Sequence, residues 1–504
     1  MFDHLLAALP TAIALSILIG NAAWITTAHA TRSQFQPENA QSISTLTKSP
    51  QESINMSFFT PSRIAQNPAQ TAELDAYLQA HYETGRFMGA AIVSQSDEFQ
   101  SGETVFVNSY GMANLEHQVP HTRSTKFRIG SITKQFTAAA ILQLQDRGLL
   151  DVQAPIATYL PDYPNGERIT LHHLLTHTAG IPNLNDYLEL IKQPITLEDL
   201  IARFRDLPLD FEPGEQYRYS NSGYTLLTQV IEQVSGQSYA DYLQTQLFTP
   251  LNLEDTGYEH PLAVIDALAN GYRFMGEGYQ QAEYINTAVS AGAGGLYSTL
   301  GDLVRWHQFL MNADKRPAGI LSDAAITAMK SPQVAMGEDA PDLSYGYGLV
   351  IGKQGFIFHA GGINGFMTYL GSLPEQGITV AVLSNVENAN PSLMAEDLLA
   401  ILRGESYDLP TNEAAATVDL DVLEGYIGTY QVTPEFQVAI TVESGQLHIQ
   451  GTGQPMIPLY PASENEFFAR MLEFRIVFNT ALDGTVESAT LLQNGQELPA
   501  PRVD

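Results

Sequence analysis

The stretch Gly130-Ser131-Ile132-Thr133-Lys134 places a serine and a lysine three residues apart at the head of an apolar segment. In a helix, positions i and i+3 share a face, so the lysine amine would reach the serine hydroxyl. A serine oxygen is a weak nucleophile until a neighbouring base removes its proton, and a lysine in a partly dry pocket can be neutral enough to do so. The stretch therefore predicts a catalytic pair.

By itself, the S-x-x-K spacing also fits a helix cap followed by a solvated lysine. The residues after Lys134 argue against that interpretation. They predict a helix that is apolar on nearly every side, with Phe136, Ala138, Ala139, Ala140, Ile141, Leu142 and Leu144. Such helices are buried, and a lysine at the start of a buried helix needs a partner or a function.

Two further motifs lie downstream. Tyr219-Ser220-Asn221 follows Pro213-Gly214, a turn signal that places the tyrosine and the asparagine on a loop. His359-Ala360-Gly361-Gly362 follows Phe356-Ile357-Phe358, a short apolar run that predicts a strand ending at the histidine. The motifs S-x-x-K, Y-x-N and H-x-G thus occur in this order, at an expected helix start, loop and strand end.

Together the three motifs resemble those of the serine β-lactamase and penicillin-binding-protein superfamily. The branch is that of class C β-lactamases, D-alanyl-D-alanine carboxypeptidases, D-aminopeptidases and lactamase-like esterases. The resemblance covers about residues 70 to 405 and extends to Phe127-Arg128-Ile129-Gly130, to the stretch from Leu174 to Pro182, and to Gly294-Gly295-Leu296-Tyr297-Ser298-Thr299 with Asp302. It implies an α+β fold, in which an antiparallel sheet is flanked by helices and carries a helical subdomain.

The resemblance also implies a two-step acyl transfer. Ser131 would attack a carbonyl to give an acyl-enzyme, and water would later release the acyl group. Lys134 would take the hydroxyl proton or lower the pKa of Tyr219, whose phenol otherwise titrates near 10. Tyr219 would hand a proton to the leaving group, while Asn221 would hold the substrate amide and face Lys134.

By match to the family, the backbone amides of Ser131 and Gly362 form the oxyanion hole, and Gly361 lets the strand approach the substrate closely. His359 and Ala360 depart from the family's usual Lys-Thr-Gly or Lys-Ser-Gly. A permanent cation is replaced by a group with an ordinary pKa near 6.5, and a hydroxyl donor is lost. Both lost groups grip the carboxylate of penicillins and of D-Ala-D-Ala. We therefore expect weak β-lactam hydrolysis, with His359 and Gly361 binding an amide or ester that lacks this carboxylate.

Three functions remain open at this point. The first is an exported serine hydrolase that cleaves amide bonds of D-amino-acid-containing peptides or related small amides. The second is a carboxylesterase using the same acyl-serine chemistry. The third is a penicillin-binding module with little turnover. The complete set of Ser131, Lys134, Tyr219 and Asn221 argues against the third, because a pure binder has no use for a proton-transfer network.

The amino-acid composition limits which binding partners and cofactors are expected. The chain has 504 residues, with 24 basic against 55 acidic side chains and a formal net charge of −31, which disfavours nucleic acid. It contains no cysteine, so disulfides and thiolate metal sites are excluded. His173 and His177 have the spacing of a metal pair but lack the glutamate of H-E-x-x-H, so packing and backbone hydrogen bonding are favoured. No cofactor and no metal are expected, and the oligomeric state is left open.

The amino-terminal segment has the pattern of a signal peptide. Residues 5–20 are almost wholly apolar and too short to span a bilayer, and Ala28-His29-Ala30 fits the cleavage rule. The usual Lys or Arg is missing before it, so a weak signal, a different start or an uncleaved anchor stay possible. The expectation is export to the periplasm or beyond, with no stable membrane span after cleavage. The domains expected are a signal peptide (1–30), a flexible linker (31–68), the hydrolase domain (69–405), a linker (406–420) and a β-barrel (421–504).

Hydrophobic periodicity supports this division. The hydrolase domain is expected to contain a helix, two strands, a helical middle, three strands and a closing helix, at residues 72–82, 89–93, 105–110, 131–310, 356–359, 366–373, 378–384 and 393–402. The last segment has about eight short alternating runs, enough for a small closed antiparallel barrel, and its start resembles a lipocalin-like appendage. Two roles are open for it: a stability or interface module, or one wall of the active-site cleft.

Overall fold

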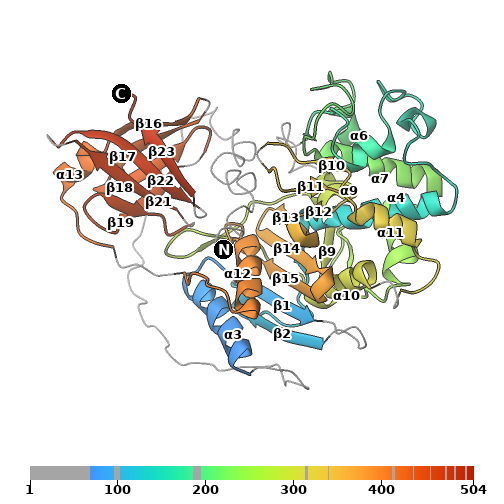
Figure 1. Cartoon of the computed structure of the whole chain (residues 1–504), viewed down its shortest axis with the longest axis horizontal. Coiled ribbons are helices and arrows are strands. Elements are labelled where there is room, and N and C mark those ends of the chain that lie inside the picture. Colours follow the sequence, from blue (N-terminus) through green and yellow to red (C-terminus); the bar gives the residue numbers. More distant parts are fainter. Residues whose placement is uncertain are drawn as a thin grey trace, which may run out of the picture.

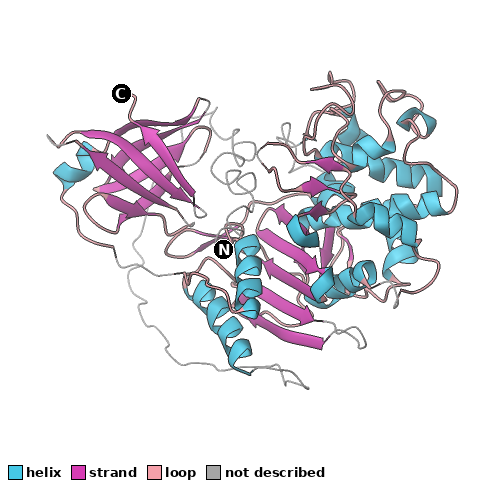
Figure 2. Cartoon of the chain, viewed as in Figure 1, coloured by secondary structure: helices cyan, strands magenta, loops and turns pink. Residues whose placement is uncertain are grey.

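The computed structural model describes residues 68–95, 103–184, 195–312, 316–338, 340–410, 415–434, 436–454, 456–471, 474–481, 484–493 and 496–504. The expected signal peptide and nearly all of the expected amino-terminal linker lie outside these residues. The described part consists of a mixed helix and strand domain followed by a domain built almost entirely of strands, as Figure 2 shows.

An eight-stranded antiparallel sheet forms the centre of the first domain. Its strand order is β10-β11-β12-β13-β14-β15-β1-β2. The bounds are Val334–Ala335, Ser344–Tyr345, Val350–Ile351, Ile357–Ile363, Phe366–Leu373, Ile378–Ser384, Gly89–Gln95 and Glu103–Tyr110. The first strand, β1, therefore pairs with the last strand of this domain, β15, and β2 lies beyond β1 at the sheet edge. The helical region is inserted in sequence between these two ends of the domain. The expected α+β fold is confirmed.

Helices cover both faces of this sheet. On one face, α3 (Pro68–Glu83) and α12 (Pro391–Arg403) pack side by side (Figure 1). The helix predicted over residues 72–82 is confirmed in α3, whose buried residues Leu74, Tyr77, Leu78 and His81 are spaced to lie on one face. The other face carries α10 (Leu300–Met311) and the helical region. This region includes α4 (Thr133–Asp146), α5 (Leu171–Leu175), α6 (Leu197–Ala202), α7 (Asn221–Ser235), α9 (Ala291–Gly294) and α11 (Asp323–Lys330).

The helix after the S-x-x-K motif is buried as predicted. In α4 every residue from Thr133 to Leu144 is buried, so the helix runs through the core of the helical region. Phe136 stacks on Trp306 of α10, with ring centroids 4.4 Å apart. Burial on all sides fixes the direction of the first turn of α4, and with it the placement of Lys134.

The predicted end of the strand at His359 is wrong. Strand β13 continues through both glycines to Ile363, and it pairs with β14 over its whole length, with His359 opposite Leu370 and Gly361 opposite Thr368. Glycine weakens a strand in isolation, which is why the pattern indicated an end there. Here the pairing with β14 keeps the ladder intact, and the glycines mark a close backbone approach.

The second domain is an eight-stranded antiparallel barrel, preceded by the short helix α13 (Leu420–Gly425). Strands β16 to β23 follow one another around it, with bounds Gly428–Thr433, Phe436–Glu443, Gln446–Gly451, Ile457–Pro461, Glu466–Phe468, Arg475–Thr480, Val486–Gln493 and Gln496–Pro501. The ends meet where the Val503 amide donates to the Thr429 carbonyl at 2.9 Å. Large side chains fill the interior, among them Val438, Ile440, Phe467, Ile476, Phe478 and Leu491. The barrel is thus a packed core.

The barrel contacts the first domain at the hairpin of β7 (Tyr272–Phe274) and β8 (Tyr279–Gln281). Asn388 exchanges hydrogen bonds with both backbone groups of Phe274, at 3.0 and 2.9 Å. Its amide nitrogen also lies 2.6 Å from the Met471 carbonyl oxygen of the barrel. The neighbouring Arg470 pairs with Glu277 at 3.6 Å. One asparagine therefore joins the barrel, the hairpin and the segment after β15.

Candidate active site

Ser131 lies in a single 3-10 turn, Gly130–Ile132, which links β5 (Phe127–Arg128) to α4. Gly130 has φ +49°, and a Cβ atom on it would lie 2.8 Å from the Gly362 nitrogen. Only glycine combines this left-handed backbone with such a close approach. The turn that carries the serine therefore packs directly against strand β13.

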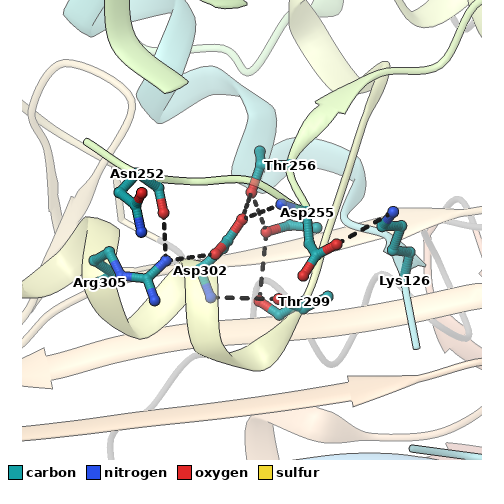
Figure 3. A network of polar contacts seen from close by, with 8 residues as sticks. Lys126, Asn252, Asp255, Thr256, Thr299, Asp302 and Arg305 are labelled. Atoms are coloured by element: carbon teal, nitrogen blue, oxygen red, sulfur yellow. Dashed lines mark hydrogen bonds and ion pairs between the residues drawn. The ribbon is translucent and has the colours of Figure 1, made fainter. Parts of the chain in front are cut away.

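The strand before Ser131 is braced by ion pairs. Arg128 binds Glu259 through two parallel hydrogen bonds, Nε to Oε2 and Nη2 to Oε1, both 2.7 Å long. Lys126 pairs with Asp255 at 3.3 Å. Figure 3 shows Asp302 accepting from the Asp255 amide and from the Thr256 hydroxyl, at 2.9 and 2.8 Å. Through these contacts the buried Asp302 ties the loop that carries Asp255 and Thr256 to helix α10.

Lys134 is fully buried and its amine makes three contacts. The Nζ atom lies 3.1 Å from Ser131 Oγ, 2.7 Å from Asn221 Oδ1 and 2.8 Å from the Ala293 carbonyl oxygen. It also lies 4.7 Å from the centre of the Tyr219 ring. Burial lowers the pKa of Lys134 well below its usual range. The arrangement can therefore supply a neutral amine beside the serine hydroxyl.

The Ala293 carbonyl is a contact that the motifs did not reveal. It belongs to α9, a tight buried turn that the Thr137 hydroxyl holds by donating to the Gly292 carbonyl at 2.7 Å. The Gly292 amide in turn donates to the Thr228 hydroxyl at 2.9 Å. Glycines at 292, 294 and 295 are typical of a tight turn, but residue types do not reveal which main-chain oxygen the turn presents.

Tyr219 lies on the expected loop, with its ring over the lysine amine. Burial raises the pKa of its phenol above the usual value, and a hydrogen bond to Ser131 opposes this shift in part. The expectation of a loop is wrong for Asn221, which begins helix α7 after Ser220 as N-cap residue. Serine is a preferred N-cap residue, although the Ser220 hydroxyl makes no capping hydrogen bond and donates to the Ile181 carbonyl oxygen at 3.3 Å. The backbone N–H of Asn221 donates to Asn183 Oδ1 at 3.0 Å, which fixes this helix end.

His359 is buried, and both its ring nitrogens have partners. Nε2 lies 3.0 Å from the Tyr345 hydroxyl and Nδ1 lies 2.6 Å from the Ala360 carbonyl oxygen. These contacts fit the tautomer in which Nδ1–H donates to the carbonyl and Nε2 accepts from the tyrosine. Burial and the nearby Lys134 lower the pKa of His359 to about 3. The position that carries a cation in the family's usual motif thus holds a neutral ring here.

The two glycines of β13 meet the turn that carries the serine. A Cβ atom on Gly361 would lie only 2.0 Å from the Ile129 carbonyl oxygen, so no other residue fits without a backbone shift. The Thr368 hydroxyl of β14 lies within hydrogen-bond distance of both Ile129 and Gly361 carbonyl oxygens, at 3.0 and 3.1 Å. The structure therefore brings Gly362 next to Ser131 and gathers all seven predicted site residues in one region.

The two histidines with metal-pair spacing bind the backbone instead. His173 Nδ1 accepts from the Thr170 amide at 3.3 Å within a capping box, and His177 Nδ1 accepts from the Ser220 amide at 3.2 Å. Within the residues that the structure describes, no three His, Asp or Glu side chains are grouped so that they could hold a metal ion.

Comparison with known proteins agrees with this fold. A family model described as Beta-lactamase matches residues 74–405, and one described as Domain of unknown function (DUF3471) matches residues 412–500. Penicillin-binding protein 4* of Bacillus subtilis is 30% identical over 460 residues, which cover 84% of this chain and 98% of that protein. The chain therefore belongs to the β-lactamase family of serine hydrolases.

Solved structures show the same architecture. The octameric penicillin-binding protein homologue from Pyrococcus abyssi is 26% identical with a TM-score of 0.57, and the match covers 85% of this chain and 99% of that one. The D-amino acid amidase from Ochrobactrum anthropi SV3, in complex with L-phenylalanine amide, has a TM-score of 0.58 at 22% identity, over 67% of this chain and 99% of that one. The second likeness concerns the fold alone.

Proposed function

We propose that this protein is an exported serine hydrolase that cleaves amide bonds of D-amino-acid-containing peptides or related small amides through an acyl-serine intermediate. One observation carries the proposal: the amine of the fully buried Lys134 lies 3.1 Å from the Ser131 hydroxyl. A buried amine with a lowered pKa is a base, whereas a solvated lysine is an acid at neutral pH. Ser131 is therefore the nucleophile.

Acylation follows from a neutral Lys134 and a protonated Tyr219 beside Ser131. Ser131 Oγ attacks the substrate carbonyl as Lys134 takes its proton, and the backbone amides of Ser131 and Gly362 stabilise the oxyanion. The raised pKa of Tyr219 keeps its phenol protonated, which favours the lysine over a tyrosinate as the base. Tyr219 then gives its proton to the departing amine and regains one from Lys134. Asn221 Oδ1, 2.7 Å from Nζ, keeps the lysine amine directed at the Ser131 hydroxyl.

Deacylation reuses the same groups. The neutral Lys134 removes a proton, directly or by relay through the Tyr219 hydroxyl, from a water molecule that attacks the acyl carbonyl. The proton returns to Ser131 Oγ as the C–O bond breaks, which restores the starting state and releases the carboxylic acid.

The substrate preference rests on His359. Its neutral ring gives no cation for a substrate carboxylate, so we propose weak turnover of β-lactams and of peptides ending in D-Ala-D-Ala. D-Amino acid amides, the substrates named for one solved neighbour, carry no such carboxylate. The same observation favours a second candidate, a carboxylesterase, because simple esters also lack it. A binding module with little turnover is the third candidate, and it fits less well because Ser131, Lys134, Tyr219 and Asn221 are all kept together in one proton-transfer network.

Export is proposed from the apolar run at residues 5–20 and Ala28-His29-Ala30. In the described part of the chain, no helix has both the length and the apolar character needed to cross a membrane. The net charge of −31 favours a small peptide or amide over nucleic acid as partner. Amino-terminal sequencing of the protein recovered from a secreting host checks the export proposal, which an intact residue 1–30 segment would contradict.

A substrate panel tests the reaction. Purified protein is assayed with D- and L-aminoacyl p-nitroanilides, p-nitrophenyl esters, a D-Ala-D-Ala peptide and a chromogenic cephalosporin, with Ser131→Ala as the blank. We expect the highest kcat/KM on a D-aminoacyl amide and the lowest on the cephalosporin. Equal turnover of cephalosporin and amides would overturn the substrate proposal, and faster turnover of simple esters alone would select the carboxylesterase.

A further inference from the structure

His177 lies at the centre of a cluster of aromatic rings beside the candidate active site. Its ring centroid is 4.3 Å from that of Tyr219, 4.7 Å from Tyr345 and 5.1 Å from Tyr224. It is 2% exposed. The imidazole thus forms the surface on which the Tyr219 ring rests.

The same residue holds the chain on both sides of Tyr219. The His177 carbonyl accepts from the Arg218 amide at 2.9 Å, and His177 Nδ1 accepts from the Ser220 amide at 3.2 Å. With the ring contact, three separate interactions therefore determine where the phenol lies. Among the described residues of the site, no other one is hydrogen-bonded to both Arg218 and Ser220, the residues on either side of Tyr219.

The backbone of His177 is strained in a way that this role explains. It has φ +59°, a left-handed conformation that costs a non-glycine residue free energy. The conformation turns the carbonyl and the side chain of one residue toward the same loop. Strain of this kind persists where the surrounding structure requires it.

The ring also carries an unused donor. Since Nδ1 accepts a hydrogen bond, the proton of the neutral ring is on Nε2, which is buried without a hydrogen-bond partner. Burial and the nearby Lys134 and His359 lower the pKa of His177 well below its usual range. A neutral ring adds no positive charge beside the lysine amine at the moment when that amine gains a proton, at the cost of one unmade hydrogen bond.

We propose that His177 is a positioning residue that holds the Tyr219 phenol in line with the leaving group. The proposal rests on the proposed function, in which Tyr219 protonates the departing amine. It predicts an effect that depends on the leaving group. An amine must be protonated to leave, whereas p-nitrophenolate and fluoride leave without a proton.

The test compares three variants on two substrates with the same acyl group. His177→Ala removes the ring and the acceptor, His177→Asn keeps an acceptor for Ser220 and tolerates the left-handed backbone, and His177→Phe keeps the ring alone. For His177→Ala we expect kcat on an aminoacyl amide to fall about 100-fold with KM changed little, because a misplacement of about 1 Å costs this much. Turnover of the matching p-nitrophenyl ester should fall by less than about 5-fold. The asparagine variant should recover part of the amide activity.

His173→Asn is the matched control. His173 lies in α5, the short helix that ends just before His177, and takes part in its capping box, but it does not contact Tyr219 in the described structure. This variant should lower the melting temperature and leave the ratio of amide to ester turnover unchanged. Circular dichroism and thermal melts of all variants establish which ones fold.

Three outcomes decide the proposal. A folded His177→Ala protein that loses amide and ester turnover equally, or whose KM alone rises, would overturn the positioning role. A folded variant with normal amide turnover would do the same. Failure of the proposed function itself would give a different result: the Ser131→Ala variant, with His177 unchanged, would still turn over the substrates.

Discussion

The amine of Lys134 and the hydroxyl of Ser131 are 3.1 Å apart inside a protein core where the lysine side chain has no exposed surface. Two backbone features maintain this distance: the buried first turn of α4 and the Ala293 carbonyl, 2.8 Å from the amine. A lysine held by neutral acceptors and desolvated on every side is poised to accept a proton. The chemistry proposed for the site follows from this one pair.

The two glycines of β13 should respond very differently to alanine. Gly361→Ala places a methyl group 2.0 Å from the Ile129 carbonyl, so strand and serine turn must separate and kcat should fall by about 100-fold or more. In Gly362→Ala the nearest atom is the Met367 sulfur at 3.2 Å, a flexible neighbour, and the backbone amide is retained. We expect less than about a 10-fold loss there. Steady-state kinetics on one amide substrate checks both variants, and equal losses would contradict the assigned close approach.

The ion pair of Arg128 and Glu259 should stabilise the strand that leads to Ser131. Their side chains are 21% and 10% exposed, so removing one partner leaves a largely buried charge unpaired. Arg128→Ala should lower the free energy of unfolding by about 2 kcal/mol, and the double variant with Glu259→Ala should recover part of that loss. Urea denaturation of the four proteins measures the coupling. Strictly additive single effects would show that the pair does not brace the strand.

Acid should destabilise the fold through buried histidines. Burial lowers the pKa of His81, His307 and His359 to about 3 and that of His121 to about 4. Their ordinary pKa is about 6.5, so between pH 6 and pH 4 the unfolded chain binds protons that the folded chain does not. Stability should therefore fall as the pH drops through this window, by up to about 1.4 kcal/mol per pH unit for each histidine.

The histidine contribution is separable from that of carboxylates by substitution. His307→Gln preserves hydrogen-bonding groups toward Ser372 and Gln135 while removing one titrating ring. Urea midpoints at pH 4, 5, 6 and 7 should show a shallower pH dependence for this variant than for the wild type. Identical slopes in the two proteins would contradict the buried neutral state of His307.

The regular elements were accessible from the sequence because their patterns are local. Strands β14 and β15 have the bounds that hydrophobic periodicity indicated, and the apolar run after Lys134 predicted a buried helix. These features depend on neighbours within a few residues, so periodicity is sufficient to find them. The helix predicted over residues 72–82, which the structure has as α3, is a feature of the same kind.

The features that were missed depend on contacts distant in sequence. His359 lies inside a strand because β14 pairs with it, and the Ala293 carbonyl reaches Lys134 because two threonines hold its turn. His177 offered a metal-like spacing, whereas its contacts with Arg218 and Ser220 form only when the loop folds back. Residue types carry no information about main-chain oxygens or about which ring faces which, so these parts required the structure.

The most direct measurement is the rate of covalent labelling by a fluorophosphonate probe, followed by peptide mapping of the labelled serine. The account predicts a label on Ser131, no label in Ser131→Ala, and labelling slowed by about 10²-fold to 10⁴-fold in Lys134→Arg, because a guanidinium stays protonated and cannot act as the base. A label on another serine, or a Lys134→Arg protein that reacts at the wild-type rate, would contradict it.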